Sequence, residues 1–248
     1  MHKKLAEIIQ KTKADLIKRK QAARPFANSL TSSKESTIAI IAEIKLASLN
    51  EGDLGNEGEV ADRVKQYQKS GVAAISVVTE KHFFKGSMLL IERIKNVVSL
   101  PVLQKDFIVD SYQIYESKIA GADAVLLIAK ILTETELISL VKLTKEFGME
   151  PVVEINNSGD LKKTLKTNTD IIAVNARDLD TFEVDVEKAC QLIKVIPSNF
   201  IKLGFSGIHS NAEVKKYKQA GAKAILVGTE LMRASDIDLF IQELKNDS

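Results

Sequence analysis

The stretch Gly121-Ala-Asp-Ala-Val125 has two close relatives elsewhere in the chain, and this repetition decides the fold. Gly71-Val-Ala-Ala-Ile75 stands 50 residues before it, and Gly221-Ala-Lys-Ala-Ile225 stands 100 residues after it. Each glycine closes a segment with helical spacing of apolar residues and precedes an apolar run. A glycine ends a helix well because it adopts the left-handed conformation at no steric cost. Each copy therefore marks a turn from a helix into a strand.

The rest of the chain extends this pattern to eight strands. A repeat of 50 residues predicts a fourth copy near residue 171, and Thr169-Asp-Ile-Ile172 stands there without the glycine. Each period of 50 residues covers two strand–helix units, so four periods cover eight. The apolar runs are continuous, as in strands that helices cover. The sequence therefore predicts an α/β protein with a (β/α)8 barrel, the TIM-barrel architecture. The expected strands are 37–45, 73–80, 101–107, 124–129, 151–155, 171–175, 200–206 and 224–227.

Amphipathic helices are expected between these strands, for example over 88–98, 134–146 and 212–220. Thr133 and Glu136 have the spacing of a capping box that opens the second of them. The structural alternative is a doubly wound open sheet. That fold usually has fewer strands and often carries a G-x-G-x-x-G turn, which is absent from this sequence.

Composition restricts the class of protein. Hydrophobic residues make up 45% of the 248 residues, and no apolar run approaches the ~20 residues of a membrane span, so we expect a soluble chain that binds no membrane. The lone cysteine, Cys190, lies on the apolar face of an expected helix, where it is a packing residue. One cysteine excludes an internal disulfide and suits a reducing compartment, so we expect a cytoplasmic protein. The net charge of +2 indicates no particular partner.

Charge is concentrated at the N-terminus. Residues 1–24 hold eight Lys or Arg against Glu7 and Asp15, with apolar residues at helical spacing. The acidic residues and the lack of a long apolar core argue against a transit or signal peptide, and the lack of aromatic residues argues against nucleic acid. We therefore expect an accessory helix, and we interpret residues 1–248 as one barrel domain with residues 1–36 as an N-terminal helical extension. A monomer is expected, with an oligomer left open.

Polar residues gather where the expected strands end, which is where barrels of this kind carry their chemistry. Glu43 and Lys45 close the first strand, Lys105 the third and Glu154 the fifth. Residues two apart on a strand share a face, so Glu43 and Lys45 can pair with each other and with Lys105 or Glu154 across the mouth. Burying several charges is costly unless they pair or serve a ligand. A purely structural ion-pair network is the alternative. It would explain polar residues at one or two strand ends, but not at as many as five of them.

The last two strands end on small turns that expose backbone amides. Ser206-Gly207-Ile208 and Gly228-Thr229-Glu230 each precede a helical pattern. Exposed amides at helix N-termini form anion sites, and the loops after strands 7 and 8 of such barrels often hold a phosphate. The residues alone thus predict a barrel enzyme that acts on a phosphorylated small molecule, with lysine and glutamate as acid and base.

Several motifs at the strand ends resemble those of the indole-3-glycerol-phosphate synthase family, in order from about residue 25 to residue 245. The motifs are Ala42-Glu-Ile-Lys45-x-Ala47-Ser48, Thr79-Glu80 with Phe83-Phe84-Lys-Gly86-Ser87, Leu103-Gln-Lys-Asp-Phe-Ile108, Glu154-Ile155, Val174-Asn175-x-Arg177-Asp-Leu179, Ser206-Gly-Ile208 and Leu226 to Arg233. The resemblance implies conversion of 1-(2-carboxyphenylamino)-1-deoxyribulose 5-phosphate into indole-3-glycerol phosphate, with loss of carbon dioxide and water, in tryptophan biosynthesis. It implies no cofactor and no metal, and the three histidines are scattered along the chain.

The resemblance also implies catalytic roles. Lys105 would be the general acid at the ketone oxygen, because a positioned ammonium stabilises charge that develops there. Lys45 would contact the substrate carboxylate and serve the dehydration, although which lysine serves which step is left open. Glu154 would be the base that removes the ring proton, Glu43 would orient Lys45, and Asn175 would position the base or a substrate hydroxyl.

The remaining site residues are implied as substrate-binding. Arg177 would bind an anionic group, and a phosphate would sit at the turns after strands 7 and 8. Phe83, Phe107 and Leu126 would wall the aromatic pocket, with ordinary core packing as the alternative for each. The full expected binding set is Arg177, Ser48, Ser206, Gly207, Gly228, Thr229, Phe83, Phe107 and Leu126.

Two departures from the family pattern bear on activity. The family usually continues the first strand as Ser-Pro-Ser, whereas Ser48 is followed here by Leu49-Asn50, which should loosen the loop that closes over the substrate. The family usually has glutamate before Ser206, and Phe205 stands there instead, which removes a charge and shrinks the cavity. The acid and the base remain, so we expect retained or retuned activity. The alternatives are a Schiff-base lyase or aldolase, which an activated lysine would support, and an inactive barrel that binds phosphorylated ligands.

Overall fold

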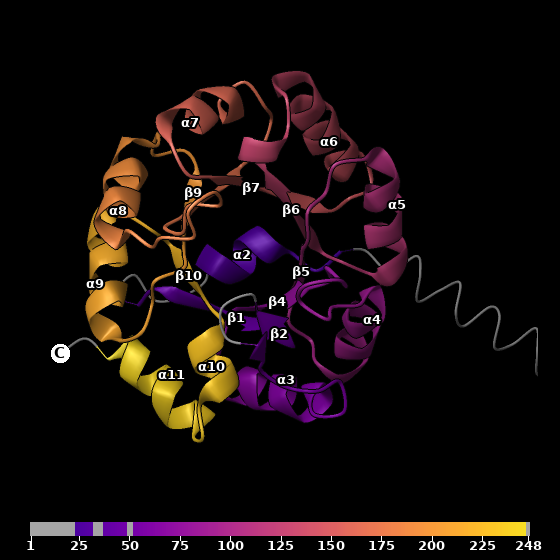
Figure 1. Ribbon diagram of the computed structural model, residues 1–248, viewed down its shortest axis with the longest axis vertical. Coiled ribbons are helices and arrows are strands. Elements are labelled where there is room, and N and C mark those ends of the chain that lie inside the picture. The colour runs from indigo at the N-terminus through magenta and orange to yellow at the C-terminus, as the bar shows by residue number, and fades with distance from the viewer. Residues whose placement is uncertain (1–22, 32–36, 49–51, 247–248) are drawn as a thin grey trace, which may run out of the picture.

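Eight parallel strands close into a barrel in the computed structural model, which describes residues 23–31, 37–48 and 52–246. Neighbouring strands follow one another around the ring, and the first pairs with the last through Ala42 and Val227. The helices form an outer ring around them (Figure 1). The barrel strands are β1 (Ala39–Ile44), β4 (Ala74–Val78), β5 (Val102–Lys105), β6 (Ala124–Ile128), β7 (Glu150–Ile155), β8 (Ile171–Asn175), β9 (Ile201–Phe205) and β10 (Ala224–Val227).

The predicted barrel is confirmed, with all eight strands where the sequence indicated and bounds that differ by up to two residues. A short hairpin, β2 (Ala47–Ser48) with β3 (Gly52–Asp53), follows the first strand. The helices are α2 (Phe26–Thr31), α3 (Val60–Lys69), α4 (Met88–Val97), α5 (Ser111–Ala120), η1 (Ala129–Ile131), α6 (Glu134–Glu146), α7 (Ser158–Thr164), α8 (Val186–Val195), α9 (Asn211–Ala220), α10 (Thr229–Arg233) and α11 (Ile237–Lys245).

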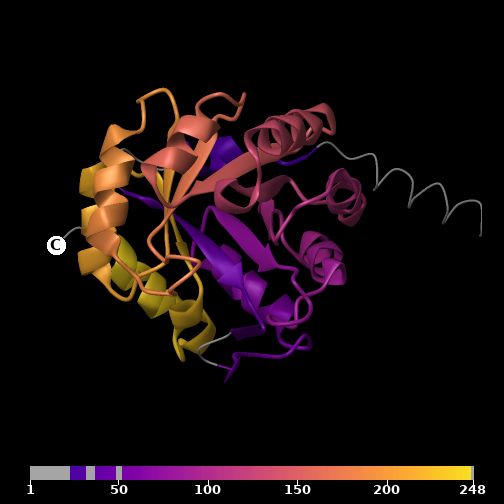
Figure 2. The same ribbon diagram turned by 45° about the horizontal axis from the view of Figure 1, so that its top comes forward.

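Two apolar layers explain why the strands read as continuous hydrophobic runs. Side chains such as Leu103, Leu126 and Phe205 fill the interior of the barrel. Their neighbours along the pleat, such as Val102 and Val125, pack outward against the ring of helices. Helices surround the strands (Figure 2), and β6, for example, is buried along its whole length, so neither face has to carry a row of polar residues.

The helix ends follow from local chemistry. Gly71, Gly121 and Gly221 adopt φ values of 75°, 89° and 100°, so each repeated glycine has the left-handed conformation that ends a helix. The capping box at α6 is confirmed, since Thr133 and Glu136 each accept a backbone N–H from the other. Cys190 is buried on α8, as expected of a packing residue.

Helix α2 closes the amino-terminal end of the barrel. Helix α2 lies across that opening (Figure 1) and buries Phe26 and Leu30 against the interior side chains. The Glu150 carboxylate, at the start of β7, accepts the amides of Phe26 and Ala27 at 2.7 and 2.9 Å. Much of the expected extension, namely residues 1–22 and 32–36, lies outside the described residues.

A buried carboxylate fastens this end of the molecule. Asp123 accepts the Lys95 ammonium at 2.6 Å and the backbone amides of Arg24 and Val102 at 2.6 and 2.8 Å. The Arg24 guanidinium also donates to the carbonyl oxygens of Lys95, Val98 and Leu100. One carboxylate therefore joins the chain before α2 to α4 and β5.

Among the described helices, none combines the length and apolar character that crossing a membrane requires.

Candidate active site

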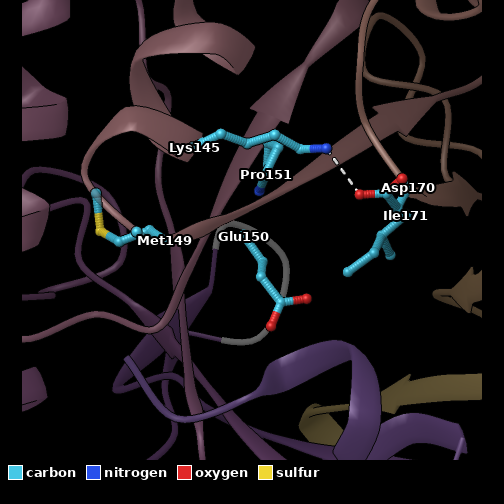
Figure 3. Close-up of a pocket in the computed structure, with 7 residues that line it drawn as sticks. Lys145, Met149, Glu150, Pro151, Asp170 and Ile171 are labelled. Atoms are coloured by element: carbon cyan, nitrogen blue, oxygen red, sulfur yellow. Dashed lines mark hydrogen bonds and ion pairs between the residues drawn. The ribbon is translucent and has the colours of Figure 1, made fainter. Parts of the chain in front are cut away.

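The carboxyl ends of the strands surround a cavity of about 320 Å³. Of the residues expected at the site, all but Phe83 line this cavity. A smaller cavity of about 250 Å³ lies at the opposite end, near α2 (Figure 3). An exposed ion pair, Lys145 with Asp170 at 2.7 Å, crosses it, and the Glu150 carboxylate points towards α2. Glu150 is thus occupied by the amides at the start of α2, and the residues expected at the site lie at the larger cavity.

Glu43 is the centre of an ion cluster in that mouth. It is 3% exposed, and its two carboxylate oxygens lie 3.0 Å from the Lys45 ammonium and 3.5 Å from the Lys105 ammonium. The Lys45 ammonium also donates to the Thr229 hydroxyl at 3.3 Å. The expectation that these charges pair across the mouth is confirmed for Glu43 with both lysines. One buried carboxylate thus balances two ammonium groups that face the cavity.

This cluster fixes the charge state of its members. Burial alone would raise the pKa of Glu43, but the ammonium groups of Lys105 and Lys45 outweigh it and hold the pKa below the ordinary value. Burial alone would lower the pKa of Lys105, but the carboxylates of Glu43 and Glu154 outweigh it and raise that pKa. Both groups are therefore charged at neutral pH, and Lys105 carries a proton that it can donate to a ligand.

Glu154 has a different environment from Glu43. It is 3% exposed, its Oε1 accepts the Asn175 side-chain amide at 3.1 Å, and its Oε2 is buried without a hydrogen-bond partner. Burial is the main cause that raises the pKa of Glu154. A carboxylate that lines a cavity, has a raised pKa and keeps one oxygen without a hydrogen-bond partner is suited to accept a proton from a ligand.

Asn175 and Arg177 are held by hydrogen bonds from the loops after β7 and β8. The Asn175 carbonyl accepts the Asn156 amide at 2.9 Å, and the Asn175 side-chain oxygen accepts the Arg177 backbone N–H at 3.0 Å. The Arg177 guanidinium donates to the Phe182 carbonyl at 2.9 Å. These bonds keep the Asn175 amide aimed at Glu154 while the guanidinium faces the cavity.

The turns after β9 and β10 differ from each other. Gly228 directly precedes α10, so this turn opens a helix as expected. Ser206 and Gly207 instead have φ values of 69° and 70°, and α9 begins only after the Ser210 cap. The Tyr217 hydroxyl donates to the Ser206 carbonyl at 3.0 Å and holds this turn from behind. The two turns follow neighbouring strands, and Ser206, Gly207, Gly228 and Thr229 all line the cavity.

The aromatic wall corrects one expectation. Phe83 is 65% exposed and absent from the cavity wall, whereas its neighbour Phe84 lines the cavity. The Glu80 carboxylate accepts the backbone amides of His82, Phe83 and Phe84, so the chain turns tightly here and has no strand pleat from which side-chain direction could be read. The sequence offered no signal to choose between the two rings.

Other lining residues were also missed. Leu179 and Phe182 come from the loop after β8, and Glu80, Ile208 and His209 come from other loops. Leu179, Glu80 and Ile208 belong to the family-like motifs, whereas Phe182 and His209 lie outside them. Phe205 faces the barrel interior and lines the cavity at 1% exposure, in agreement with the expectation that a phenyl ring stands where the family pattern has a carboxylate. The segment Leu49-Asn50 lies outside the described residues.

The described residues include no group of three or more His, Cys, Asp or Glu side chains that could hold a metal ion. The cluster of Glu43, Lys45 and Lys105 supplies positive charge at the mouth directly from side chains.

Asp106, next to Lys105 on the chain, accepts the Thr79 hydroxyl at 2.6 Å and the Phe107 amide at 2.8 Å. It therefore anchors the strand end.

Solved structures of other proteins share this fold. A 3-hexulose-6-phosphate synthase superposes with a TM-score of 0.65 at 15% identity, over 84% of this chain and 98% of that one. A structure titled as native KDPGal superposes with a TM-score of 0.59 at 12% identity, over 83% and 90%. At these identities the likeness concerns the barrel alone.

Sequence comparison is more specific. A family model described as indole-3-glycerol phosphate synthase matches residues 1–244. The indole-3-glycerol phosphate synthase of Aliarcobacter butzleri is 40% identical over 258 residues, which covers 98% of each chain, and that of Caldanaerobacter subterraneus is 42% identical over 222 residues, which covers 89% and 85%. A multifunctional tryptophan biosynthesis protein of Schizosaccharomyces pombe is 41% identical over 90% of this chain and 30% of its own length. The chain belongs to the indole-3-glycerol phosphate synthase family.

Proposed function

We propose that the mouth formed by Glu43, Lys45, Lys105 and Glu154 closes the indole ring of indole-3-glycerol phosphate. The substrate would be 1-(2-carboxyphenylamino)-1-deoxyribulose 5-phosphate, and carbon dioxide and water would leave. One observation carries the proposal: two ammonium groups share one buried carboxylate while a second carboxylate keeps an unused oxygen in the same cavity. The ammonium groups can therefore act as acids while the second carboxylate acts as a base, and the proposed reaction needs both.

Lys105 acts first, as the general acid of ring closure. The aromatic carbon that bears the carboxylate attacks the ketone carbon of the sugar chain, and negative charge develops on the ketone oxygen. A protonated ammonium beside that oxygen stabilises the charge and then transfers its proton. The raised pKa of Lys105 supports this role, because it keeps the group protonated at neutral pH.

Lys45 and Arg177 handle the negative groups near the ring. Lys45 contacts the substrate carboxylate until carbon dioxide leaves, and it assists the departure of the hydroxyl as water. The Arg177 guanidinium adds a second positive group at the cavity. The Lys45 ammonium is steered by Glu43 at 3.0 Å and by the Thr229 hydroxyl at 3.3 Å, so its donors are oriented before a ligand arrives.

Glu154 completes the reaction by taking the proton whose loss restores aromaticity. Its raised pKa brings it closer to neutral pH, where a base is most effective. The Asn175 amide orients the carboxylate through Oε1 and leaves Oε2 for the proton. The phosphate binds at the turns that carry Ser206, Gly207, Gly228 and Thr229, which expose amides to one side of the cavity.

The apolar part of the substrate binds on the opposite wall. Phe107 and Leu126 line the cavity there, Phe84 takes the place expected for Phe83, and Ser48 lies at the rim. The lone buried cysteine fits a reducing compartment, and we propose that the enzyme works in the cytoplasm.

Product formation by the purified chain tests the proposal. The carboxyphenylamino substrate is added, and the fluorescence of indole-3-glycerol phosphate is followed together with the release of carbon dioxide. We expect both products in a one-to-one ratio without any added cofactor. A folded parent chain that forms neither product contradicts the proposal. Borohydride trapping with the same substrate should leave the chain unmodified, whereas an adduct on a lysine would indicate Schiff-base chemistry.

A further inference from the structure

Gly228 lies directly behind the side chain of Glu43. A Cβ atom placed on Gly228 would stand 2.4 Å from Glu43 Oε1, 3.1 Å from Cδ and 3.4 Å from Cβ of the same residue. Its three nearest neighbours thus all belong to the Glu43 side chain. The contact follows from the barrel register: Ala42 pairs with Val227, so the next residue of β1, Glu43, lies beside Gly228, the residue that follows β10.

This contact involves the carboxylate on which the ion cluster depends. Glu43 Oε1 is the oxygen that holds the Lys45 ammonium at 3.0 Å, and its partner oxygen holds the Lys105 ammonium at 3.5 Å. A methyl group on Gly228 would force Oε1 to retreat by about 1 Å before it reached ordinary contact at 3.4 Å. Such a displacement changes both ammonium contacts at once.

We propose that Gly228 is a positioning residue of the reaction centre: the missing side chain leaves the space in which the Glu43 carboxylate meets both ammonium groups. This role differs from binding phosphate through the Gly228 amide, and it rests on the proposed function of Lys45 and Lys105. The neighbouring hydroxyl of Thr229 contacts Lys45, so the turn after β10 positions both members of the Glu43–Lys45 pair.

Gly207 provides a matched control in the other amide-bearing turn. A Cβ on Gly207 would stand 2.6 Å from Val186 Cγ2 and 2.7 Å from Val184 Cγ1, and its φ of 70° disfavours other residues. Alanine at Gly207 therefore disturbs the proposed phosphate side of the cavity without touching Glu43. Gly207→Ala and Gly228→Ala share the effects of altering an anion-binding turn, and only Gly228→Ala displaces the carboxylate.

A double-mutant cycle tests the proposal through activity. Gly228→Ala is measured in the parent and in Glu43→Ala, which removes the colliding atoms. Because a misplacement of this size can cost on the order of a hundredfold in rate, we expect kcat/KM to fall by about that factor in the parent and to change less than about threefold in Glu43→Ala. Gly207→Ala should cost the same factor in both backgrounds. Equal losses for Gly228→Ala in both backgrounds would overturn the proposal.

Two further readouts do not depend on that cycle. In a crystal structure of Gly228→Ala, we expect the Glu43 carboxylate to be displaced and its 3.0 Å contact with Lys45 to be broken. An unchanged contact overturns the proposal, whatever the activity.

The pH profile of the same variant is the second readout. The charged groups that act on Lys105 are Glu43, Glu154 and Arg177. Displacing Glu43 should therefore move the alkaline limb of kcat/KM to lower pH, and Gly207→Ala should leave it in place. A parent chain without activity would contradict the proposed function but leave the crystallographic test valid.

Discussion

At the scale of single residues, the proposed chemistry depends on Glu43, which contacts both lysines while remaining buried. Its carboxylate is held ionised by Lys105 and Lys45, and it raises the pKa of Lys105 in return. Glu154 lies in the same cavity but has an amide as its side-chain partner, and burial raises its pKa. The two carboxylates therefore have opposite shifts, and this difference assigns charge balance to one and proton transfer to the other.

Glu43→Gln should move the alkaline limb of the pH profile. Lys105 must be protonated to act as an acid, and the Glu43 carboxylate opposes the effect of burial on its pKa. Without that charge the pKa of Lys105 falls, so kcat/KM should begin to decline at a lower pH than in the parent. Glu230→Gln removes a carboxylate at the rim that pairs with His209, and it serves as the charge-matched control. A limb that stays or moves to higher pH in Glu43→Gln would contradict the assignment.

Asn175→Ala should move the acid limb instead. The Asn175 amide donates to Glu154 and favours the ionised form, so its loss raises the pKa of Glu154 further. Glu154 must be ionised to act as a base, and activity should therefore disappear at a higher pH as the solution is acidified. The pH dependence of kcat/KM measures this shift. An unchanged acid limb, or a shift confined to the alkaline limb, would show that Glu154 is not the titrating base.

The sequence predicted most of these residues because a strand has a fixed pleat. Glu43, Lys105 and Glu154 are at or next to strand ends, so a period of two specified the face on which each lies. Phe83 and Phe84 lie in a turn held by Glu80, where no such period exists, and the wrong ring was chosen. The contact between Gly228 and Glu43 depends on the pairing of the first and last strands, which becomes visible only once the barrel closes.

At the scale of elements, α2 serves as the plug of the barrel. Its six residues are too few to form a stable helix alone. It is held by the burial of Phe26 and Leu30 and by the Glu150 carboxylate, which accepts two amides of its first turn. The sequence indicated a helical extension before the barrel, but the partner of these amides lies more than 120 residues further on, which no local pattern could have revealed.

Glu150→Ala should destabilise the protein by removing this cap. The loss of a carboxylate that accepts amides at a helix start costs about 1–2 kcal/mol. The measurement is the free energy of unfolding in urea. Glu146→Ala, on the exposed side of α6, is the control, because its pair with Lys142 at 3.8 Å contributes little. A Glu150→Ala variant as stable as Glu146→Ala would contradict the role assigned to the cap.

At the scale of the whole molecule, the two ends of the barrel have different tasks. The amino-terminal end carries the fully buried Asp123, whose carboxylate joins three residues, Arg24, Lys95 and Val102. The carboxyl-terminal end carries the charged cavity of about 320 Å³. The repeated glycines predicted the barrel that separates these two ends, and the separation predicts that stability and activity can be altered independently.

Asp123→Ala tests this separation. Removing one partner of a buried ion pair leaves Lys95 uncompensated and costs about 3–5 kcal/mol in the free energy of unfolding. Asp170→Ala removes an exposed pair at the same end and should cost less than about 1 kcal/mol. At temperatures well below its thermal unfolding midpoint, Asp123→Ala should retain a kcat within about threefold of the parent. The substitution is far from the mouth and should leave the activation barrier of the reaction nearly unaltered. Parallel losses of stability and kcat would contradict the separation.

The central claim is that Lys105 donates the proton in ring closure, and the initial rate of indole-3-glycerol phosphate formation by Lys105→Ala tests it most directly. Lys130→Ala, which removes a lysine paired with Asp178 and Asp180 outside the cavity, is the control. We predict that Lys105→Ala, folded as the parent is, loses at least about a hundredfold in kcat/KM, the size of a general-acid contribution, while Lys130→Ala stays close to the parent. A Lys105→Ala variant within about threefold of Lys130→Ala would contradict the claim.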